Sequence, residues 1–244
     1  MLLYKKHIDN LSNFRLKDPY FHQVLIGQML ADGNLVRRSP TRNTYFRVGF
    51  GQPYQAYANW ILQYLKDHSN KGVTKRKDHG YDRYDIVTRV NPLFNYYYVL
   101  FYPYNEALDR YVKIVPKNIA SMMTPVVLAH MAIGDGTRIG NKLGLCTHGF
   151  LYEECILLAN RIRKIGLTTR VVFRRVGSKG QNQYKVEVGN TQELSKLRAM
   201  LMPHMFEGMY YKLGIGKKEI PIYKNKAIWY NFMCDNMLLS PTDR

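Results

Sequence analysis

Hydrophobic residues recur along the chain at two spacings, one typical of helices and one typical of strands. Residues 20–32 form a mostly apolar run of helical length. In residues 44–51, Phe46, Val48 and Phe50 alternate with other residues, which predicts a strand with one buried face. A second helix is predicted by apolar residues at helical spacing, namely Tyr57, Trp60, Ile61, Tyr64 and Leu65.

The first half continues with a hairpin and a third helix. Residues 72–77 and 83–90 are predicted strands, joined by a turn at Asp78-His79-Gly80. A helix that starts near Pro92 is expected to end at Tyr102-Pro103, because a helix seldom continues through proline. The predicted order is therefore helix, two strands, helix, two strands, helix.

The second half repeats this order about one hundred residues later. Matching residues stand 99 to 103 positions apart, as in Asp32 and Asp135, Tyr84 and Tyr184, Pro103 and Pro203, Tyr111 and Tyr210, and Lys113 and Lys212. A period of this length is too long for a solenoid repeat and indicates a duplicated domain. We predict an α+β fold with two pseudo-symmetric αββαββα halves, each with an antiparallel four-stranded, saddle-shaped sheet. The expected boundaries are 1–112 and 125–244, with a linker at 113–124.

Each half opens with an apolar helix that ends in Asp-Gly. The two stretches read LIGQMLADG at 25–33 and LAHMAIGDG at 128–136. Gly33 is expected to close the first helix in a left-handed conformation. A carboxylate is unfavourable at this end of a helix, because the helix dipole is negative there. Two helices with the same unfavourable acid, Asp32 and Asp135, suggest that a cation lies between them.

Small residues on both motif helices predict that these helices form the interface between the halves. They are Gly27, Ala31, Ala129, Ala132 and Gly134. Close packing would bring Asp32 and Asp135 together, which is costly unless shared cations neutralise them. Oxygen ligands of this kind suit Mg²⁺, and we expect two or more divalent cations, with Mn²⁺ able to substitute.

The charge balance indicates a polyanionic partner. Lys and Arg number 36 against 18 Asp and Glu, which gives a net charge of +18. Nucleic acid is the leading candidate for such a surplus. No membrane partner is expected, because the longest apolar run has nine residues and no basic amphipathic helix is rich enough to lie on lipid. Three scattered cysteines argue against a disulfide scaffold and a zinc site.

Basic residues gather on the predicted strands and turns of both halves. A curved pair of basic antiparallel sheets could lie in successive major grooves of double-stranded DNA. A single arginine on a strand is usually only a solvated residue, but basic hairpins at equivalent places in both halves call for a further reason. The candidate DNA contacts are Arg37, Arg38, Arg42, Arg47, Lys75, Lys77, Arg83, Arg89, Arg138, Arg170, Arg174 and Lys185.

The two Asp-Gly nonapeptides resemble the signature motifs of the LAGLIDADG homing endonucleases, in the monomeric double-motif form. The resemblance covers roughly residues 20–215 and agrees with the family in spacing and repeat order. It departs from the family pattern at His130, which stands where the first motif has Gly27, and at Gly134, which precedes the acid. Both departures bear on how tightly the motif helices can pack.

The resemblance implies a set of active-site residues. Asp32 and Asp135 would bind divalent metals with the carbonyls of the preceding residues, Ala31 and Gly134. The segments around Lys113 and Lys212 resemble those whose lysine reaches the active site. Two further residues, Gln52 and His148, resemble the polar positions that order active-site water. Each lysine alone would otherwise be a solvated residue, and a lone histidine is more often structural.

These observations predict a monomeric, metal-dependent DNA endonuclease that cuts both strands of a long target. Two alternatives stay open: an RNA-binding maturase that assists splicing of its own group I intron, and a non-catalytic DNA-binding protein on the same scaffold. The 20 tyrosines and many asparagines have AT-rich codons, which hints at an AT-rich genome. We therefore expect an intron-encoded protein of an organelle, a mitochondrion or a chloroplast. The tail at 214–244 is assigned only to packing or additional DNA contact.

Overall fold

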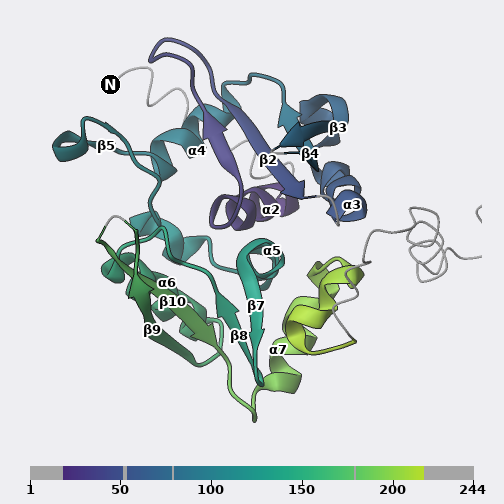
Figure 1. Ribbon diagram of the computed structural model, residues 1–244, viewed down its shortest axis with the longest axis vertical. Coiled ribbons are helices and arrows are strands. Elements are labelled where there is room, and N and C mark those ends of the chain that lie inside the picture. Colours follow the sequence, from purple (N-terminus) through teal and green to yellow (C-terminus); the bar gives the residue numbers. More distant parts are fainter. Residues whose placement is uncertain (1–18, 52–53, 79, 179, 217–244) are drawn as a thin grey trace, which may run out of the picture.

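The computed structural model describes residues 19–51, 54–78, 80–178 and 180–216. Within them the first half has the predicted order of elements (Figure 1). These are α2 (Pro19–Met29), β1 (Asn34–Val36), β2 (Tyr45–Gly51), α3 (Gln55–Leu65), β3 (Ser69–Asp78), β4 (Tyr81–Thr88) and α4 (Leu93–Phe101). Residues 1–18 and most of the predicted tail lie outside the described residues.

The second half repeats the series after a short connection. Its elements are α5 (Pro125–Asp135), β7 (Gly136–Ile139), β8 (Lys142–Leu145), α6 (Tyr152–Lys164), β9 (Thr169–Val176), β10 (Asn182–Val188) and α7 (Leu194–Leu201). The connection holds a small hairpin, β5 (Tyr104–Asn105) with β6 (Arg110–Tyr111), and the 3₁₀ helix η4 (Lys117–Ser121). The predicted linker is packed rather than loose, because Ile119 of η4 is fully buried.

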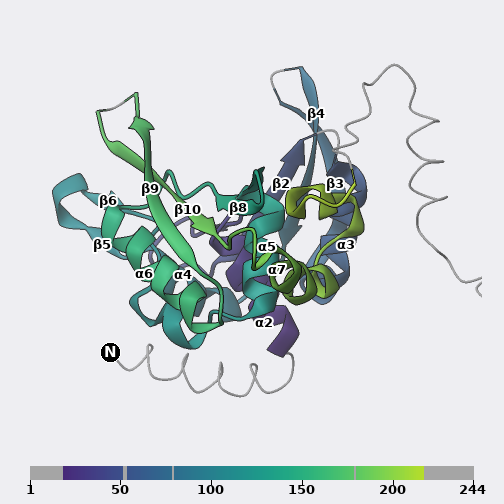
Figure 2. The same cartoon turned by 90° about the horizontal axis from the view of Figure 1, so that it is seen from below.

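The two sheets have the same topology. Their strand orders are β1-β2-β4-β3 and β7-β8-β10-β9, with every neighbouring pair antiparallel. In β2 the predicted alternation holds, since Phe46, Val48 and Phe50 are buried. The face that carries such residues packs on helices, and we call the opposite face of each sheet its open face. The long hairpins β3–β4 and β9–β10 project toward the same side of the molecule (Figure 2). The predicted α+β fold of two pseudo-symmetric halves is confirmed.

The motif helices α2 and α5 pack side by side at the centre of the molecule, as predicted (Figure 1). A Cβ added at Gly27 would lie 2.6 Å from Cβ of His130 and 2.7 Å from the carbonyl oxygen of Val127. At this point of the crossing, therefore, only glycine leaves room for the second helix. The bulky His130 fits because its ring turns away and stacks on Trp60, with the ring centroids 5.4 Å apart.

The two Asp-Gly pairs end their helices differently from the prediction. Helix α2 ends at Met29, before the acid, whereas α5 continues to Asp135. Gly33 is absent from the residues with positive φ, so the predicted left-handed cap is wrong. Glycine is needed there for space, because a Cβ at Gly33 would lie 2.7 Å from the carbonyl oxygen of Gln28. Gly136 serves likewise, since its Cβ would lie 2.2 Å from the Ala132 carbonyl oxygen.

Burial of His130 predicts acid sensitivity. Burial, assisted by nearby His204, lowers the pKa of His130 to about 3, so the folded protein keeps the ring neutral. Below the ordinary histidine pKa the unfolded chain binds the proton and the folded chain does not. Stability is therefore present above that pKa and is lost as the pH falls through it, by at most about 1.4 kcal/mol per pH unit.

The test is urea unfolding at pH 7 and pH 4.5 for the wild type and for His130→Leu. We expect the wild type to lose about 2–3 kcal/mol more than the variant over this interval. Equal losses in both proteins would show that His130 titrates normally in the fold.

Candidate active site and nucleic-acid interface

The two motif acids stand at matching ends of α2 and α5, where the halves meet. Asp32 follows the last turn of α2, and Asp135 is the last residue of α5. A Cβ added at Gly134 would lie 3.4 Å from Oδ2 of Asp32, so this carboxylate closely approaches the second motif. Burial, followed by the negative charge of Asp32, raises the pKa of Asp135 to about 6. The structure therefore brings the two acids together.

Two lysines donate hydrogen bonds to carbonyl oxygens at the C-terminal ends of the motif helices. Lys113 donates from Nζ to the carbonyl oxygens of Ala31, at 2.8 Å, and Gly33, at 2.9 Å. Lys212 lies on the 3₁₀ helix η6 (Glu207–Leu213) and is buried. It donates to three carbonyl oxygens, those of Ala132 at 3.2 Å, Gly134 at 3.0 Å and Ile133. Lys113 thus places a positive charge at the negative end of α2, and Lys212 does so at α5.

The lysines also influence the acids. Burial lowers the pKa of Lys113 to about 8, against the opposing effect of the negative charges of Asp135 and Asp32. In return, the charges of Lys113 and Lys212 lower the pKa of Asp135, but less than burial and Asp32 raise it. The centre therefore contains two carboxylates and two ammonium groups, of which Asp135 and Lys113 are strongly desolvated. Such perturbed groups are typical of functional sites.

The donor set fits a hard divalent cation with an incomplete protein shell. The described residues contain no group of three or more His, Cys, Asp or Glu side chains that could hold a metal ion. The available oxygens are the carboxylates of Asp32 and Asp135 and the carbonyls of Ala31 and Gly134. Both carbonyls already accept a lysine hydrogen bond, but a carbonyl oxygen has a second lone pair. Mg²⁺ binds in this manner, with water and phosphate oxygens completing its shell.

The open face of the first sheet carries a cluster of arginines around Asp85, and two of them, Arg76 and Arg83, also pair with Asp78 at 3.4 and 3.5 Å. Arg47 and Arg83 donate to Asp85 at 3.1 and 3.0 Å, and Arg76 also pairs with Asp85. Arg76 is directly opposite Arg83 in the register of β3 and β4, so both side chains lie on one face. Arg76 is not among the DNA contacts predicted from the sequence. The signal was the point at which the hairpin reverses, because pairing of Asp78 with Tyr81 also pairs position 76 with position 83.

Two predicted DNA contacts lie on the opposite face of the same hairpin. Lys75 is paired in register with the buried Tyr84, and Lys77 is paired with Asp82. Both lysines form ion pairs with Asp82, at 2.9 and 2.7 Å. They therefore do not share the open face with Arg83. The physical reason is the period of two along a strand, which places 75 and 77 on the other side from 76.

The second sheet presents fewer, more dispersed charges on its open face. Lys185 alternates with the buried Val186, and Arg170 is opposite Glu187 in register. Arg174 lies in the part of β9 that faces a register shift at Gln183/Tyr184. Its positive charge acts to lower the pKa of Cys146 and that of His148. The remaining predicted contact of this sheet, Arg138, is opposite the buried Leu143 and donates to the Gly140 carbonyl at 2.9 Å. Arg138 consequently lies on the helix side of the edge strand.

The remaining arginines lie at the ends of the first sheet. Arg38 and Arg42 are exposed in the turn between β1 and β2. Arg37 supports this turn, because it donates to the Arg42 carbonyl at 2.8 Å and to that of Pro40, and lies over the Tyr98 ring. Arg89, after β4, donates to the Asp67 carbonyl. Arg37 and Arg89 thus contribute to the fold through their guanidinium groups.

Comparison with known proteins gives the family. The model of the LAGLIDADG DNA endonuclease family matches residues 22–194, well over half of the chain. The chain belongs to this family. It has two LAGLIDADG motifs in one polypeptide, so the double-motif resemblance stated from the sequence is confirmed.

Individual relatives are distant. The DNA endonuclease I-ChuI of Chlamydomonas applanata is 22% identical over 207 residues, which cover 80% of this chain and 94% of that protein. The cytochrome b mRNA maturase bI2 of Saccharomyces cerevisiae is 26% identical over 210 residues, covering 78% of this chain and 46% of the maturase. The structure of the homing endonuclease I-WcaI bound to its DNA recognition sequence matches with a TM-score of 0.66 at 20% identity. That match covers 80% of this chain and 85% of I-WcaI.

The LAGLIDADG resemblance implies two further residues, of which the structure describes one. Gln52 lies outside the described residues. His148 follows β8 and is half-buried, where burial and the charges of Arg175, Arg174 and Lys185 lower its pKa. It therefore belongs to the basic surface of the second sheet. No described helix of this LAGLIDADG protein has the length and apolar character needed to cross a membrane.

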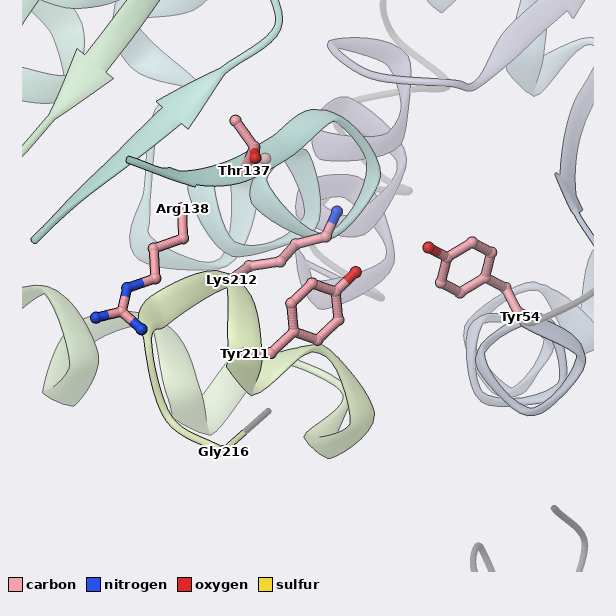
Figure 3. Close-up of a pocket in the computed structure, with 7 residues that line it drawn as sticks. Tyr54, Thr137, Arg138, Tyr211, Lys212 and Gly216 are labelled. Carbon is pink, nitrogen blue, oxygen red and sulfur yellow. The ribbon is translucent and has the colours of Figure 1, made fainter. Parts of the chain in front are cut away.

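A pocket of about 560 Å³ adjoins the second LAGLIDADG motif. Its lining residues are Tyr54, Gly136, Thr137, Arg138, Tyr211, Lys212 and Gly216. Figure 3 shows the hydroxyl groups of Tyr54 and Tyr211 directed toward each other from the two halves. Burial, with smaller contributions from Tyr54, raises the pKa of Tyr211, so its hydroxyl stays protonated at neutral pH. The pocket thus collects polar groups of both halves beside Asp135.

Proposed function

We propose that this LAGLIDADG protein is a site-specific homing endonuclease that makes a metal-dependent double-strand break in a long duplex. The observation that carries the proposal is the pairing of Asp32 with Asp135 between two sheets whose open faces are basic. Two half-saddles that each cover about one helical turn suit a target of roughly 20 base pairs. The proposed contacts are Arg38, Arg42, Arg47, Arg76, Arg83, Arg170, Arg174 and Lys185.

The proposed cofactor is Mg²⁺, as two or more divalent cations, with Mn²⁺ as a substitute. When bound, such cations activate water for attack on phosphorus and stabilise the leaving oxygen. Asp32 and Asp135 would hold them with the carbonyls of Ala31 and Gly134. Lys113 and Lys212 keep positive charge next to the site, where negative charge develops during the displacement. Water in contact with bulk solvent would accept the proton.

Selection from a randomised duplex library tests the proposal. The protein is incubated with the library and Mg²⁺, cut ends are captured and sequenced, and a recovered target is assayed with Mg²⁺, Mn²⁺, Ca²⁺ or EDTA. We expect one preferred long site, cut on both strands with Mg²⁺ or Mn²⁺ and uncut with EDTA. A protein that binds duplexes without any cleavage would be the proposed DNA-binding alternative instead.

A second candidate function is that of a maturase for its own intron. It is favoured by the similarity to the maturase bI2, although this chain matches less than half of that protein's length. The basic surface would then bind folded intron RNA. A splicing assay on the host intron, with wild type and the acid variants discussed below, separates the functions: a maturase needs neither acid.

We further propose that the protein acts as a monomer in an organelle. One chain supplies both motif helices, and α2 packs against α5. This intramolecular pairing supports a monomer. The proposed division into halves is 1–112 and 125–244, joined by residues 113–124. Sedimentation of the dilute protein at the mass of one chain is the expected result, and an obligate dimer would contradict it.

The two faces of the first hairpin provide a test of the DNA surface. Arg76→Ala should weaken discrimination at one or two base pairs, by roughly 1–3 kcal/mol each, if the side chain reads base edges. Lys75→Ala, a neighbouring change on the opposite face, is the matched control and should leave discrimination unchanged. Binding to single-base variants of the selected target is measured in Ca²⁺. An effect of Lys75→Ala as large as that of Arg76→Ala would refute the assignment of faces.

The lysines should matter more for cleavage than for binding. Lys113→Met and Lys212→Met remove a charge beside the reacting phosphate, so the cleavage rate on saturated DNA should fall about 10- to 100-fold. Single-turnover cleavage and binding in Ca²⁺ are compared with those of Lys117→Met, an exposed lysine on η4. If both site variants cut at the wild-type rate, the two ammonium groups serve only to cap their helices.

A further inference from the structure

Each sheet carries one acid at the same place in its topology, on the face that should meet DNA. Asp85 on β4 is opposite Gly49 on β2, and Glu187 on β10 is opposite Gly144 on β8. Strands β4 and β10 are equivalent in the two sheet orders, and so are β2 and β8. The two acids are therefore pseudo-symmetry mates, each on a middle strand and directed to the open face.

Asp85 forms the centre of the arginine cluster in the first sheet. Its side chain is only 5% exposed, whereas those of Arg47, Arg76 and Arg83 are 37–40% exposed. The carboxylate is shielded by the three guanidinium groups that it holds. The side chain of Asp85 also lies directly against the neighbouring strand β2, because a Cβ added at Gly49 would lie 2.0 Å from Oδ1 of Asp85. The acid forms the floor of the surface and the arginines form its outer layer.

Glu187 has the same role with lysines. It pairs with Lys142 at 3.2 Å and with Lys185 at 2.9 Å, and its side chain is 11% exposed. Hydrogen bonds from Lys185 and Lys142 hold its pKa below the usual value, against the effect of burial. The pKa of Asp85 is also lowered: burial opposes ionisation, but Arg76 and Arg83 outweigh it. Both acids are thus ionised in the folded protein.

Neither acid is placed to contact DNA itself. A carboxylate can accept a hydrogen bond from cytosine N4 in the major groove. Asp85 and Glu187 are, however, nearly buried, and they already form ion pairs with three arginines and two lysines, respectively. A negative charge also weakens attraction to phosphate. Binding strength alone therefore gives no reason to have an acid at the middle of each basic sheet.

Orientation of the basic side chains gives such a reason. Lysine and arginine lose considerable side-chain freedom when fixed, and a free guanidinium can adapt to many duplex sequences. Holding the group in the unbound protein reduces the ordering that binding would otherwise require. A fixed group also tolerates fewer arrangements of donors and acceptors on the base edges. The acids would then increase discrimination between sequences while slightly reducing affinity for any duplex.

We propose that Asp85 and Glu187 are positioning residues that fix the basic side chains of their sheets for base recognition, each over its own half of the DNA target. This inference rests on the proposed endonuclease function. It assigns sequence discrimination in part to two residues that touch no base. It also predicts that discrimination in the two half-sites can be altered separately.

The test compares Asp85→Asn and Glu187→Gln with Asp82→Asn. Asp82 is a matched control because it lies on β4, is 6% exposed and binds Lys75 and Lys77, but on the opposite face. Binding is measured in Ca²⁺, without cleavage, to the selected target, to all its single-base variants and to an unrelated duplex. Thermal melting of each variant shows that it is folded at the assay temperature.

For Asp85→Asn we expect equal or tighter binding to the unrelated duplex and at least a tenfold lower ratio of target to unrelated affinity. The lost discrimination should fall on base pairs of one half-site. Glu187→Gln should affect the other half-site, and Asp82→Asn should leave the ratio unchanged. Glu187→Gln also keeps the test decisive if Asp85→Asn fails to fold.

Three results would overturn the inference. Unchanged discrimination in the folded Asp85 and Glu187 variants is one, and uniform weakening on every duplex is another. A loss spread equally over both half-sites is the third, because it would indicate a general structural effect. These failures are distinct from failure of the proposed function, in which the wild type itself prefers no duplex. In that case both proposals fall.

Discussion

Replacement of either motif acid by asparagine is expected to reduce double-strand cleavage about 100-fold or more while leaving DNA binding intact. Asp32→Asn and Asp135→Asn keep the side-chain size but remove a charged, proposed metal ligand from a site where the described residues place no group of three or more metal-binding side chains. Binding in EDTA should be equal or tighter, because an unneutralised carboxylate beside phosphate is repulsive. The assay is cleavage, with Mg²⁺, of a plasmid that carries the selected target, because nicked and linear products can then be distinguished.

The pattern of products also reports how the metals are shared. If each acid serves one strand, a single variant should still nick the other strand. If both acids hold a common cation, each variant should lose both cuts. The matched control is Asp109→Asn, an exposed position with φ of 48°, where asparagine is well tolerated. Full linearisation by either motif variant would contradict the assignment of the active site.

Most of the fold could be predicted because the hydrophobic pattern is clear and occurs twice. The alternation of Phe46, Val48 and Phe50 is reproduced as a buried face, and both sheets have the expected hairpins. Two local details were not predictable from pattern alone. The need for glycine at Gly33 comes from contact with the carbonyl of Gln28, which depends on how the chain turns after α2. The orientation of His130 depends on Trp60 of another helix.

The candidate site was less predictable than the fold. The repeated motif was enough to select the two acids, and the family resemblance added Lys113 and Lys212, but neither could show that the lysines cap the motif helices. The basic residues were selected by their place on predicted strands and turns, without the strand register. The selection therefore included Lys75 and omitted Arg76, which face opposite sides of β3. Acids such as Asp85 were missed, because only positive charge is expected of a surface that binds DNA, and the sequence does not show the ion pairs.

Gly27→Ala is expected to separate the halves and so to lower both stability and cleavage. In an isolated helix this change would stabilise by up to about 1 kcal/mol, because alanine has the higher helix propensity. Here the new methyl group would lie 2.6 Å from Cβ of His130 and 2.7 Å from the Val127 carbonyl oxygen. Neither atom can move by side-chain rotation. The helices must shift, with a net loss of roughly 1–3 kcal/mol.

Gly149→Ala is the matched control, because its added methyl group would have no heavy atom within 4 Å among the described residues, apart from Gly149 and its two chain neighbours. Thermal or urea unfolding should show a loss only for Gly27→Ala. His130→Ala should not rescue that variant, since the contacting Cβ remains. Separation of α2 and α5 also moves Asp32 away from Asp135, so the folded variant should cleave more slowly at equal DNA occupancy. Wild-type stability and cleavage for Gly27→Ala would mean that the motif helices do not hold the two acids in place.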